Sequence, residues 1–238
     1  MARPTAARQL AAIADEIVHC RACARLVEWR ERVAADKRAS FRDDDYWGRG
    51  VPGFGDPAAS IVIIGLAPAA HGANRTGRVF TGDRSGDFLF ASLHRCGLAN
   101  QPTSTHRDDG LALHGTYVLA AVRCAPPANQ PTTDERDACR PFFARELAAL
   151  SNASVLVVLG GFAYDVTWAT LRELGVARPA TRAKFAHLVE QDAGPYTIIG
   201  SFHPSQQNTF TGRLTEPMLD AVFVRAVGVA RSTQEPAG

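Results

Sequence analysis

The stretch "SIVIIGLAPAAHGANRTGRVFTGD" (60–83) joins a short apolar run to a long loop of small and polar residues. Three further apolar runs follow along the chain: "TYVLAAVRCAPP" (116–127), "SVLVVLGG" (154–161) and "YTIIGSFHP" (196–204). Each run is continuous rather than alternating, which is typical of strands buried on both faces of a parallel sheet. The four runs therefore predict the inner strands of an α/β protein.

The segments between these runs are long enough for helical crossovers, with helix-compatible spacing over 86–96, 134–150 and 164–174. Residues 8–35 predict a pair of N-terminal helices interrupted near "CRAC" (20–23), and a small β element is expected around 185–189. The polar end of the chain, 230–238, predicts a frayed tail. This order of elements favours one domain over 1–238, an α/β/α sandwich.

The composition is that of an ordinary globular protein. Hydrophobic residues make up 46% of the 238 and charged residues 21%. The net charge of +2 neither requires nor excludes a nucleic-acid partner. No apolar run approaches the length of about 18 residues that a membrane span needs, and no secretory signal is evident at the N-terminus. We therefore expect a cytoplasmic protein.

The five cysteines do not form a disulfide framework in such a protein. Cys20 and Cys23 form a CxxC pair, whereas Cys124 and Cys139 are farther apart, and Cys96 is left over. Four thiolates can bind zinc or an iron–sulfur cluster, and zinc favours two short CxxC-like loops. With only one such loop, the spacing favours a larger inorganic core. The alternative is inert buried cysteines, which is our interpretation of Cys96.

Ligands of open α/β sheets bind beyond the carboxyl ends of the strands. Three loops follow predicted strands, at 65–83, 124–133 and 203–215, and we expect them to converge on one cleft. A single histidine is usually structural, but His203 begins the third loop directly after its strand. Pro204 fixes the backbone there, and the Ser205 hydroxyl can bind an anion such as phosphate.

The motifs "GLAPAAHGANRTGRVFTGD" (65–83), "RCAPPANQPT" (123–132) and "HPSQQNTFTG" (203–212), together with the cysteines, resemble the uracil-DNA glycosylase superfamily. The resemblance is greatest to its iron–sulfur branch, type B or family 5, and extends from Cys20 to about Thr215. It implies a central four-stranded parallel sheet within the three-layer sandwich, and hydrolysis of the N-glycosidic bond of damaged bases in DNA. It also implies a 4Fe–4S cluster bound by Cys20, Cys23, Cys124 and Cys139.

The resemblance assigns catalytic roles to two side chains. His203 matches the histidine of the HPS motif and would stabilise the negative charge of the departing base. The better-known branch has an Asp in its first motif, "GQDPY", where this chain reads "GLAPA" with Ala67 in that place. The catalytic carboxylate must then lie elsewhere. We predict Asp83, because Asp87 is more simply explained as part of the following helix.

The base-binding residues follow from the same motifs. Phe80 would give the aromatic face on which an everted base stacks, unless it is a core aromatic residue, and the small Gly65, Ala67 and Ala69 leave room for that base. Other branches read the base with an Asn where this chain has Ala120; Asn129 is the expected reader here, although Asn is also a common turn residue. Fewer fixed hydrogen bonds predict a tolerant enzyme that accepts uracil, hypoxanthine and ethenocytosine.

The third loop would contact DNA through Ser205, Asn208, Phe210, Arg213 and Leu214. Either Phe210 or Leu214 would enter the vacated base stack, and Arg213 would bind a phosphate. Arg75 and Arg78 are candidate phosphate contacts or simply solvated side chains.

Lys37 and Lys184, the only lysines, lie outside the three loops, so no Schiff-base lyase is expected. The sequence thus predicts a monomeric, nucleoid-associated glycosylase that leaves an abasic site in duplex DNA. Single-stranded DNA stays open as a second substrate. Its cluster would clip the N-terminal helices to the domain. The alternatives are a non-catalytic damaged-DNA-binding module of the same fold, or a glycosylase restricted to uracil.

Overall fold

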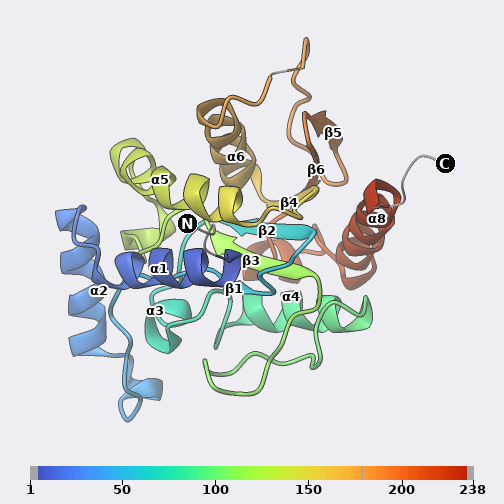
Figure 1. Ribbon diagram of the computed structural model, residues 1–238. Coiled ribbons are helices and arrows are strands. Elements are labelled where there is room, and N and C mark those ends of the chain that lie inside the picture. The colour runs from blue at the N-terminus through green and yellow to red at the C-terminus, as the bar shows by residue number, and fades with distance from the viewer. Residues whose placement is uncertain (1–4, 178, 235–238) are drawn as a thin grey trace.

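The computed structural model of the protein describes residues 5–177 and 179–234 (Figure 1). Its helices are α1 (Ala6–His19), α2 (Ala24–Asp36), α3 (Ala73–Thr76), α4 (Arg84–Arg95), α5 (Thr133–Ala149), α6 (Gly161–Glu173), α7 (Gln206–Phe210) and α8 (Glu216–Gln234), with 3-10 turns at Ala39–Phe41 and Pro127–Asn129. Its strands are β1 (Phe54–Gly55), β2 (Ile61–Gly65), β3 (Thr116–Ala120), β4 (Val155–Leu159), β5 (Glu190–Ala193) and β6 (Tyr196–Ser201).

The strands form one sheet with the order β1-β3-β2-β4-β6-β5. The four inner strands are parallel and correspond to the four apolar runs, which confirms the predicted central sheet. Ile61 pairs with both Thr116 and Val155, so the carboxyl ends of these strands lie at one edge. β1 and β5 add short antiparallel edges that the apolar runs did not predict.

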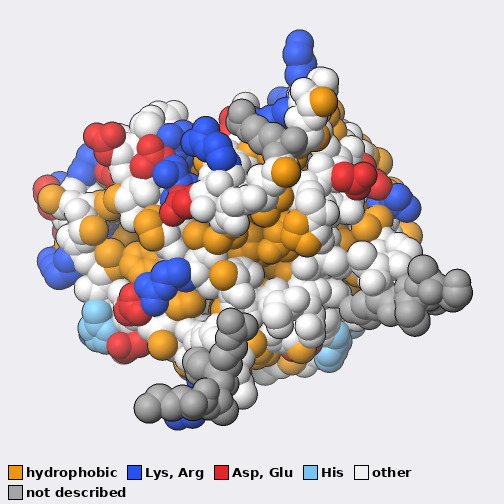
Figure 2. Space-filling view, turned by 45° about the horizontal axis from the view of Figure 1, so that its top comes forward, with side chains coloured by type: hydrophobic (Ala, Val, Ile, Leu, Met, Phe, Trp, Pro, Cys, Tyr) orange, Lys and Arg blue, Asp and Glu red, His pale blue; other side chains and the backbone are white. Residues whose placement is uncertain are grey.

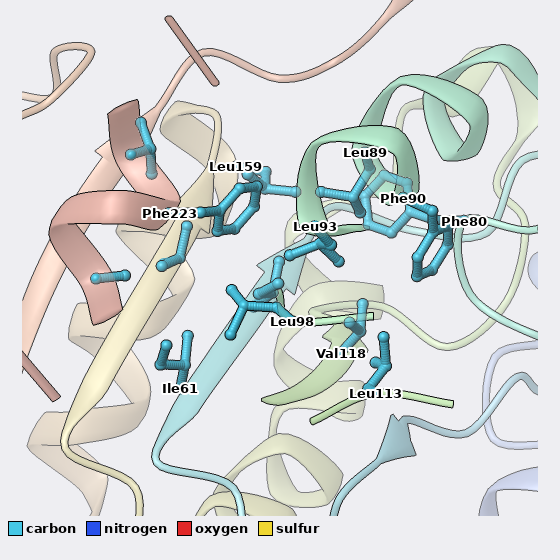
Figure 3. Packing of buried hydrophobic residues seen from close by; sticks show 14 of the residues in the cluster. Ile61, Phe80, Leu89, Phe90, Leu93, Leu98, Leu113, Val118, Leu159 and Phe223 are labelled. Carbon is cyan, nitrogen blue, oxygen red and sulfur yellow. The ribbon is translucent and has the colours of Figure 1, made fainter. Parts of the chain in front are cut away.

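Alternate residues of the inner strands face two separate cores. Ile61 and Ile63 belong to a cluster completed by α4 and α8, of which Figure 3 shows Leu89, Leu93 and Phe223. Residues on the opposite face of β2 belong to a second cluster, completed by α5 and α6. The predicted three-layer α/β/α sandwich is therefore confirmed.

The structure differs from the sequence predictions at two places. The small β element lies at Glu190–Ala193 rather than 185–189, because a two-residue turn through Gly194, with φ of +62°, pairs it directly with β6. Residues 230–234 belong to α8 instead of a frayed tail, since Phe223, Ala226 and Ala230 bury one face of that helix. The rest of the predicted tail, 235–238, lies outside the described residues.

One face of the molecule is shown in Figure 2. Side chains of both charge signs are interspersed on it, and apolar side chains reach the surface between them. This mixture agrees with the net charge of +2. Across residues 5–177 and 179–234, no helix combines the length and the apolar character needed to cross a membrane.

The two arginines of the first loop are neither solvated nor free to bind phosphate. Arg78 pairs with Asp109 at 2.7 Å, and the two side chains are only 7% and 6% exposed. Arg75 pairs with Asp44 at 2.6 Å and is itself largely buried. Both arginines therefore form ion pairs inside the protein that stabilise the loop. The prediction that they contact phosphate is wrong.

Replacing Asp109 with Asn should lower the free energy of unfolding by about 3–5 kcal/mol at pH 7, because it leaves the Arg78 charge buried without its partner. Burial alone would raise the pKa of the Asp109 carboxyl, but Arg78 and the backbone N–H groups of Leu111 and Thr105 together lower it to about 2. The contribution of the ionised Asp109 carboxylate to the free energy of unfolding is complete above the unfolded-state pKa of about 3.9. It is lost as the pH falls to about 2.

Urea unfolding of wild type and Asp109→Asn at pH 7 and pH 3 measures the difference in their free energies of unfolding. This difference should be smaller at pH 3 than at pH 7. The exposed neighbour Asp108, changed to Asn, is the matched control. Equal stability of Asp109→Asn and wild type at pH 7 would contradict the prediction.

Candidate functional site

The three predicted loops meet at the carboxyl edge of the sheet around a cavity of about 310 Å³. Its wall consists of Gly65, Leu66, Ala67, Ala69, Val79, Phe80, Asp83, Ser85, Ala120, Asn129, His203 and Ser205. All the residues predicted for catalysis and base binding are in this wall. Sequence reasoning missed Leu66, Val79 and Ser85, which carry no chemical signal of their own beyond being neighbours of predicted residues.

Phe80 is positioned by unusually close backbone packing. Its φ of +52° lies in the left-handed region, which is strained for an aromatic residue. A Cβ at Gly65 would come within 2.7 Å of the Phe80 ring, and one at Gly86 within 1.8 Å of the Phe80 carbonyl oxygen. Phe80 is 8% exposed and belongs to the core cluster, at the edge of which Figure 3 shows it. It is therefore a core residue and a wall of the cavity at once.

His203 lies beside Phe80 in the cavity wall, with 5.8 Å between the ring centroids and a tilted arrangement of the rings. Burial lowers the pKa of His203 to about 4, so its imidazole is neutral at neutral pH. A neutral imidazole has one N–H donor and one acceptor nitrogen. The His203 carbonyl accepts a hydrogen bond from Asn208 Nδ2 at 2.9 Å, and Ser205 Oγ accepts one from the Asn208 backbone at 3.4 Å. Ser205 and Asn208 thus fix the loop that carries His203.

Asp83 is the N-cap of α4, where its Oδ1 accepts a hydrogen bond from the Gly86 N–H at 3.0 Å. A Cβ at Gly72 would lie 2.0 Å from Asp83 Oδ2, so the carboxylate rests directly on that glycine. Burial raises the pKa of Asp83, and the N–H groups of Gly86 and Ser85 oppose this rise. The alternative carboxylate, Asp87, is exposed on the first turn of α4 and does not line the cavity.

Asn129 is a turn residue that also lines the cavity. It ends the turn Pro127–Asn129 with a left-handed φ of +55°, and it lines both the cavity and an adjoining hollow of about 500 Å³. Ala67, Ala69 and Ala120 have no polar side chain to offer a ligand. The polar side chains of the wall belong to Asp83, Ser85, Asn129, His203 and Ser205.

The two candidate wedge residues of the third loop, Phe210 and Leu214, differ in their exposure to solvent. Leu214 is 1% exposed and packs in the core, so its predicted entry into a base stack is wrong for the folded protein. Its burial follows from a turn in which the Leu214 N–H donates to the Asn208 carbonyl at 2.9 Å. Phe210, at the end of α7, is 74% exposed. Arg213 is also exposed, with its guanidinium carbon 4.7 Å from the centroid of the Phe202 ring.

The four predicted ligand cysteines line one small second cavity. Cys124 and Cys139 are buried there, and Cys20 and Cys23 are half-buried. Most of the remaining wall is apolar, formed by Ala22, Leu26, Val27, Ala138 and Phe142. Cys96 is the C-cap of α4, outside this wall, and it is half-buried rather than fully buried.

Two observations test whether these residues fit a metal group. Burial raises the pKa of the Cys23 and Cys124 thiols, and raises that of Cys139 to about 12, so the site is suited to thiols that keep their protons or exchange them for a metal. In the described part of the chain, no group of three or more His, Cys, Asp or Glu side chains is arranged to hold a metal ion, so the cavity has no preformed metal geometry. The fit is one of donor chemistry: four sulfur atoms at one cavity are the ligand set of an iron–sulfur cluster, whereas zinc favours two short CxxC-like loops.

The first cavity has a definite chemical capacity. A flat heterocycle can stack on Phe80 while the neutral His203 donates a hydrogen bond to it. Asp83 lies in the same wall, where a carboxylate can orient a water molecule or stabilise a developing positive charge. The arrangement suits cleavage of a bond between a flat heterocycle and a carbon that becomes electron-poor.

Comparisons with known proteins agree with this geometry. A family model for the Uracil DNA glycosylase superfamily matches residues 52–226. A type-5 uracil-DNA glycosylase of Mycobacterium tuberculosis is 51% identical over 89% of this chain and 78% of its own length. Proteins of the same name from Thermus thermophilus and Pyrobaculum aerophilum are 47% and 43% identical, over 92% and 91% of this chain and 97% and 91% of their own lengths.

His203 should remain uncharged down to about pH 5, because its burial disfavours the imidazolium form. Two-dimensional NMR of protein labelled with ¹⁵N-histidine measures this state, and the His203→Gln variant assigns the His203 signals. The ring nitrogens should show the shifts of a neutral tautomer at pH 6. The pattern of a protonated ring at that pH would contradict the prediction.

Proposed function

The chain belongs to the uracil DNA glycosylase superfamily, and on that premise we propose that it is a monofunctional glycosylase that removes uracil and related damaged bases from DNA. The observation that carries the proposal is the meeting of Phe80, His203 and Asp83 in the wall of one cavity. The names and identities of the type-5 relatives support the same activity.

In this mechanism the damaged nucleotide turns out of the stack and its base lies on Phe80. As the N-glycosidic bond breaks, the electron pair goes to the base, and the His203 N–H donates a hydrogen bond to the oxygen where negative charge develops. Asp83 stabilises the electron-poor sugar and orients the water that attacks it. Addition of that water to the sugar carbon forms the new C–O bond, and the proton that the water loses neutralises the base anion, which leaves a free base and an abasic site.

A tolerant base pocket is part of the proposal. Ala67, Ala69 and Ala120 contribute no hydrogen-bonding side chain, and Asn129 is exposed on a turn. A site rejects an analogue strongly only when binding would leave buried polar groups unpaired. We expect hypoxanthine and ethenocytosine to be removed as well as uracil.

The proposed reaction stops at the abasic site. Strand cleavage through a Schiff base needs an amine in the pocket. Lys37 and Lys184 are the chain's only lysines, and neither is among the residues that line the cavity.

Damaged duplex DNA is the proposed partner, with single-stranded DNA as a second substrate, and the protein would act on it as a monomer in the cytoplasm. Phe210 is the proposed wedge, because it is the exposed apolar side chain of the loop that carries His203. Arg213, also exposed, would bind a backbone phosphate. Ser205 and Asn208 would keep this loop in register with the cavity.

A 4Fe–4S cluster is proposed on Cys20, Cys23, Cys124 and Cys139. When bound, it would supply a covalent link between the start of the chain and the segment from β3 to α5. The protein already aligns these segments, since Arg25 at the start of α2 donates to both carboxylate oxygens of Glu135, at 2.8 and 2.7 Å. We propose a structural role for the cluster.

The Asp83→Asn variant should lose base removal by about a hundredfold or more, because the carboxylate charge is lost from the cavity. Asparagine is as good an N-cap as aspartate, so α4 should still form normally. The measurement uses a labelled duplex with deoxyuridine opposite guanine, and a second with hypoxanthine, each followed by treatment with and without hot alkali. Cleavage by wild type only after alkali is expected.

Asp87→Asn is the matched control, since Asp87 is exposed on the same helix outside the cavity. Full activity in Asp83→Asn would move the catalytic carboxylate elsewhere. Absence of cleavage by wild type on both duplexes would favour the non-catalytic DNA-binding module, and cleavage of the uracil duplex alone would favour a uracil-restricted enzyme.

The Phe210→Ala variant should lower the rate on duplex DNA at least several-fold more than on single-stranded DNA, because only the duplex has a stack for the wedge to enter. Thermal unfolding should not change, since Phe210 is 74% exposed. Leu214→Ala is the contrasting variant: its loss of a buried side chain should cost about 2–5 kcal/mol of stability. Equal rate losses on both substrates in Phe210→Ala would argue against a wedge.

A further inference from the structure

Arg30 is a buried cation beside the cysteine cavity. It lies on α2, and its side chain is 1% exposed. Nη1 donates to Cys124 Sγ at 2.8 Å, and Nη2 donates to the carbonyl oxygen of Cys20 at 2.9 Å. Its Nε has no hydrogen-bond partner. Within residues 5–177 and 179–234, Arg30 forms no ion pair with an Asp or Glu side chain. The guanidinium thus touches two of the proposed ligand residues but no carboxylate.

A second buried arginine increases the positive charge at the same cavity. Arg123 lines the cavity and is 1% exposed. Its Nη2 pairs with the buried Glu146, but its Nε and Nη1 have no partner within the described residues. Its backbone N–H donates to Cys139 Sγ at 3.2 Å. Two guanidinium groups are therefore balanced by one carboxylate.

An unbalanced buried charge is costly, so this excess requires an explanation. Arginine cannot lose its proton at any physiological pH, and burial therefore leaves the charge in place. Neutral thiols do not balance it. An anionic group in the cavity would, and four thiolates around an iron–sulfur core carry net negative charge.

We propose that Arg30 is the fixed counter-charge of the cluster and that, through its hydrogen bond to the Cys124 sulfur, it makes the cluster easier to reduce. This inference rests on the cluster proposed above. Reduction adds one electron to an already anionic group, and a positive charge in contact with a ligand sulfur stabilises the more negative state. Hydrogen bonds to the sulfurs and net charge are two of the factors that set cluster potentials.

The test is a redox titration of anaerobically purified protein, with the fraction of reduced cluster followed by electron paramagnetic resonance. Three variants are compared with wild type: Arg30→Gln removes the charge, Arg30→Lys keeps it, and Arg32→Gln is the matched control. Arg32 lies on the same helix, is half-exposed, and pairs with Glu28. Iron and acid-labile sulfide are measured in every protein before titration.

At the solution potential where wild type is half reduced, Arg30→Gln should have a ratio of oxidised to reduced cluster at least tenfold higher. For a one-electron couple this is a fall of about 59 mV in the midpoint potential. Arg30→Lys should stay within about threefold of wild type, and Arg32→Gln should match it. A ratio in iron-loaded Arg30→Gln within threefold of wild type would overturn the inference.

If Arg30→Gln loses its fold or its iron, Arg30→Lys decides. If Arg30→Lys keeps its cluster with a ratio of oxidised to reduced cluster close to that of wild type, the result supports a role of the positive charge. If Arg30→Lys loses its cluster, the inference is overturned, because the shape of the arginine side chain and not its charge is then required. Wild type without iron and sulfide would overturn the cluster proposal itself. That outcome is distinct from an iron-loaded wild type whose potential does not depend on Arg30.

Discussion

The site depends on the close packing of one short segment, 80–86, in which three glycines take part: Gly65 and Gly72 pack against the segment, and Gly86 packs within it. An added methyl group at Gly65, Gly72 or Gly86 would collide with the Phe80 ring, the Asp83 carboxylate or the Phe80 carbonyl, respectively. Close backbone approach thus holds the aromatic face, and it holds the carboxylate together with the hydrogen bond from the Gly86 N–H. Such contacts tolerate almost no displacement, because protein interiors are as densely packed as molecular crystals. The segment can therefore place both side chains with a precision that a solvated loop would lack.

Permanent charge is the second theme of the structure. The chain has only two lysines among its 26 Lys and Arg residues. Within residues 5–177 and 179–234, three arginines are buried: Arg30, Arg78 and Arg123. A buried lysine can become neutral, whereas a buried arginine stays charged and must find an anion. Arg78 forms an ion pair with Asp109, and Arg123 forms one with Glu146. Each buried arginine therefore requires a negative charge close to it in the folded protein.

The sequence was informative where burial or chemistry restricts the residue type. Strands covered on both faces must be apolar throughout, so the four inner strands could be predicted. The cavity residues could be predicted because they lie in the loops that resemble the family motifs. The polar edge strand β5 could not be predicted from hydrophobicity, because a turn rather than burial fixes its pairing. The burial of Arg78 and Leu214 also escaped prediction, since it depends on contacts with distant residues such as Asp109 and with the folded core.

The placement of the four cysteines has a consequence for protein synthesis. Cys20 and Cys23 precede the region matched by the superfamily, while Cys139 lies 116 positions after Cys23 (139 − 23). At roughly 5–20 residues per second, a ribosome takes about 6–23 s to make that interval. Cys20 and Cys23 therefore leave the ribosome ahead of Cys139 by this interval, and the proposed cluster site stays incomplete until Cys139 has been made. A cluster on these four cysteines would thus fasten α1 and α2 to the rest of the chain only after α5 has been synthesised.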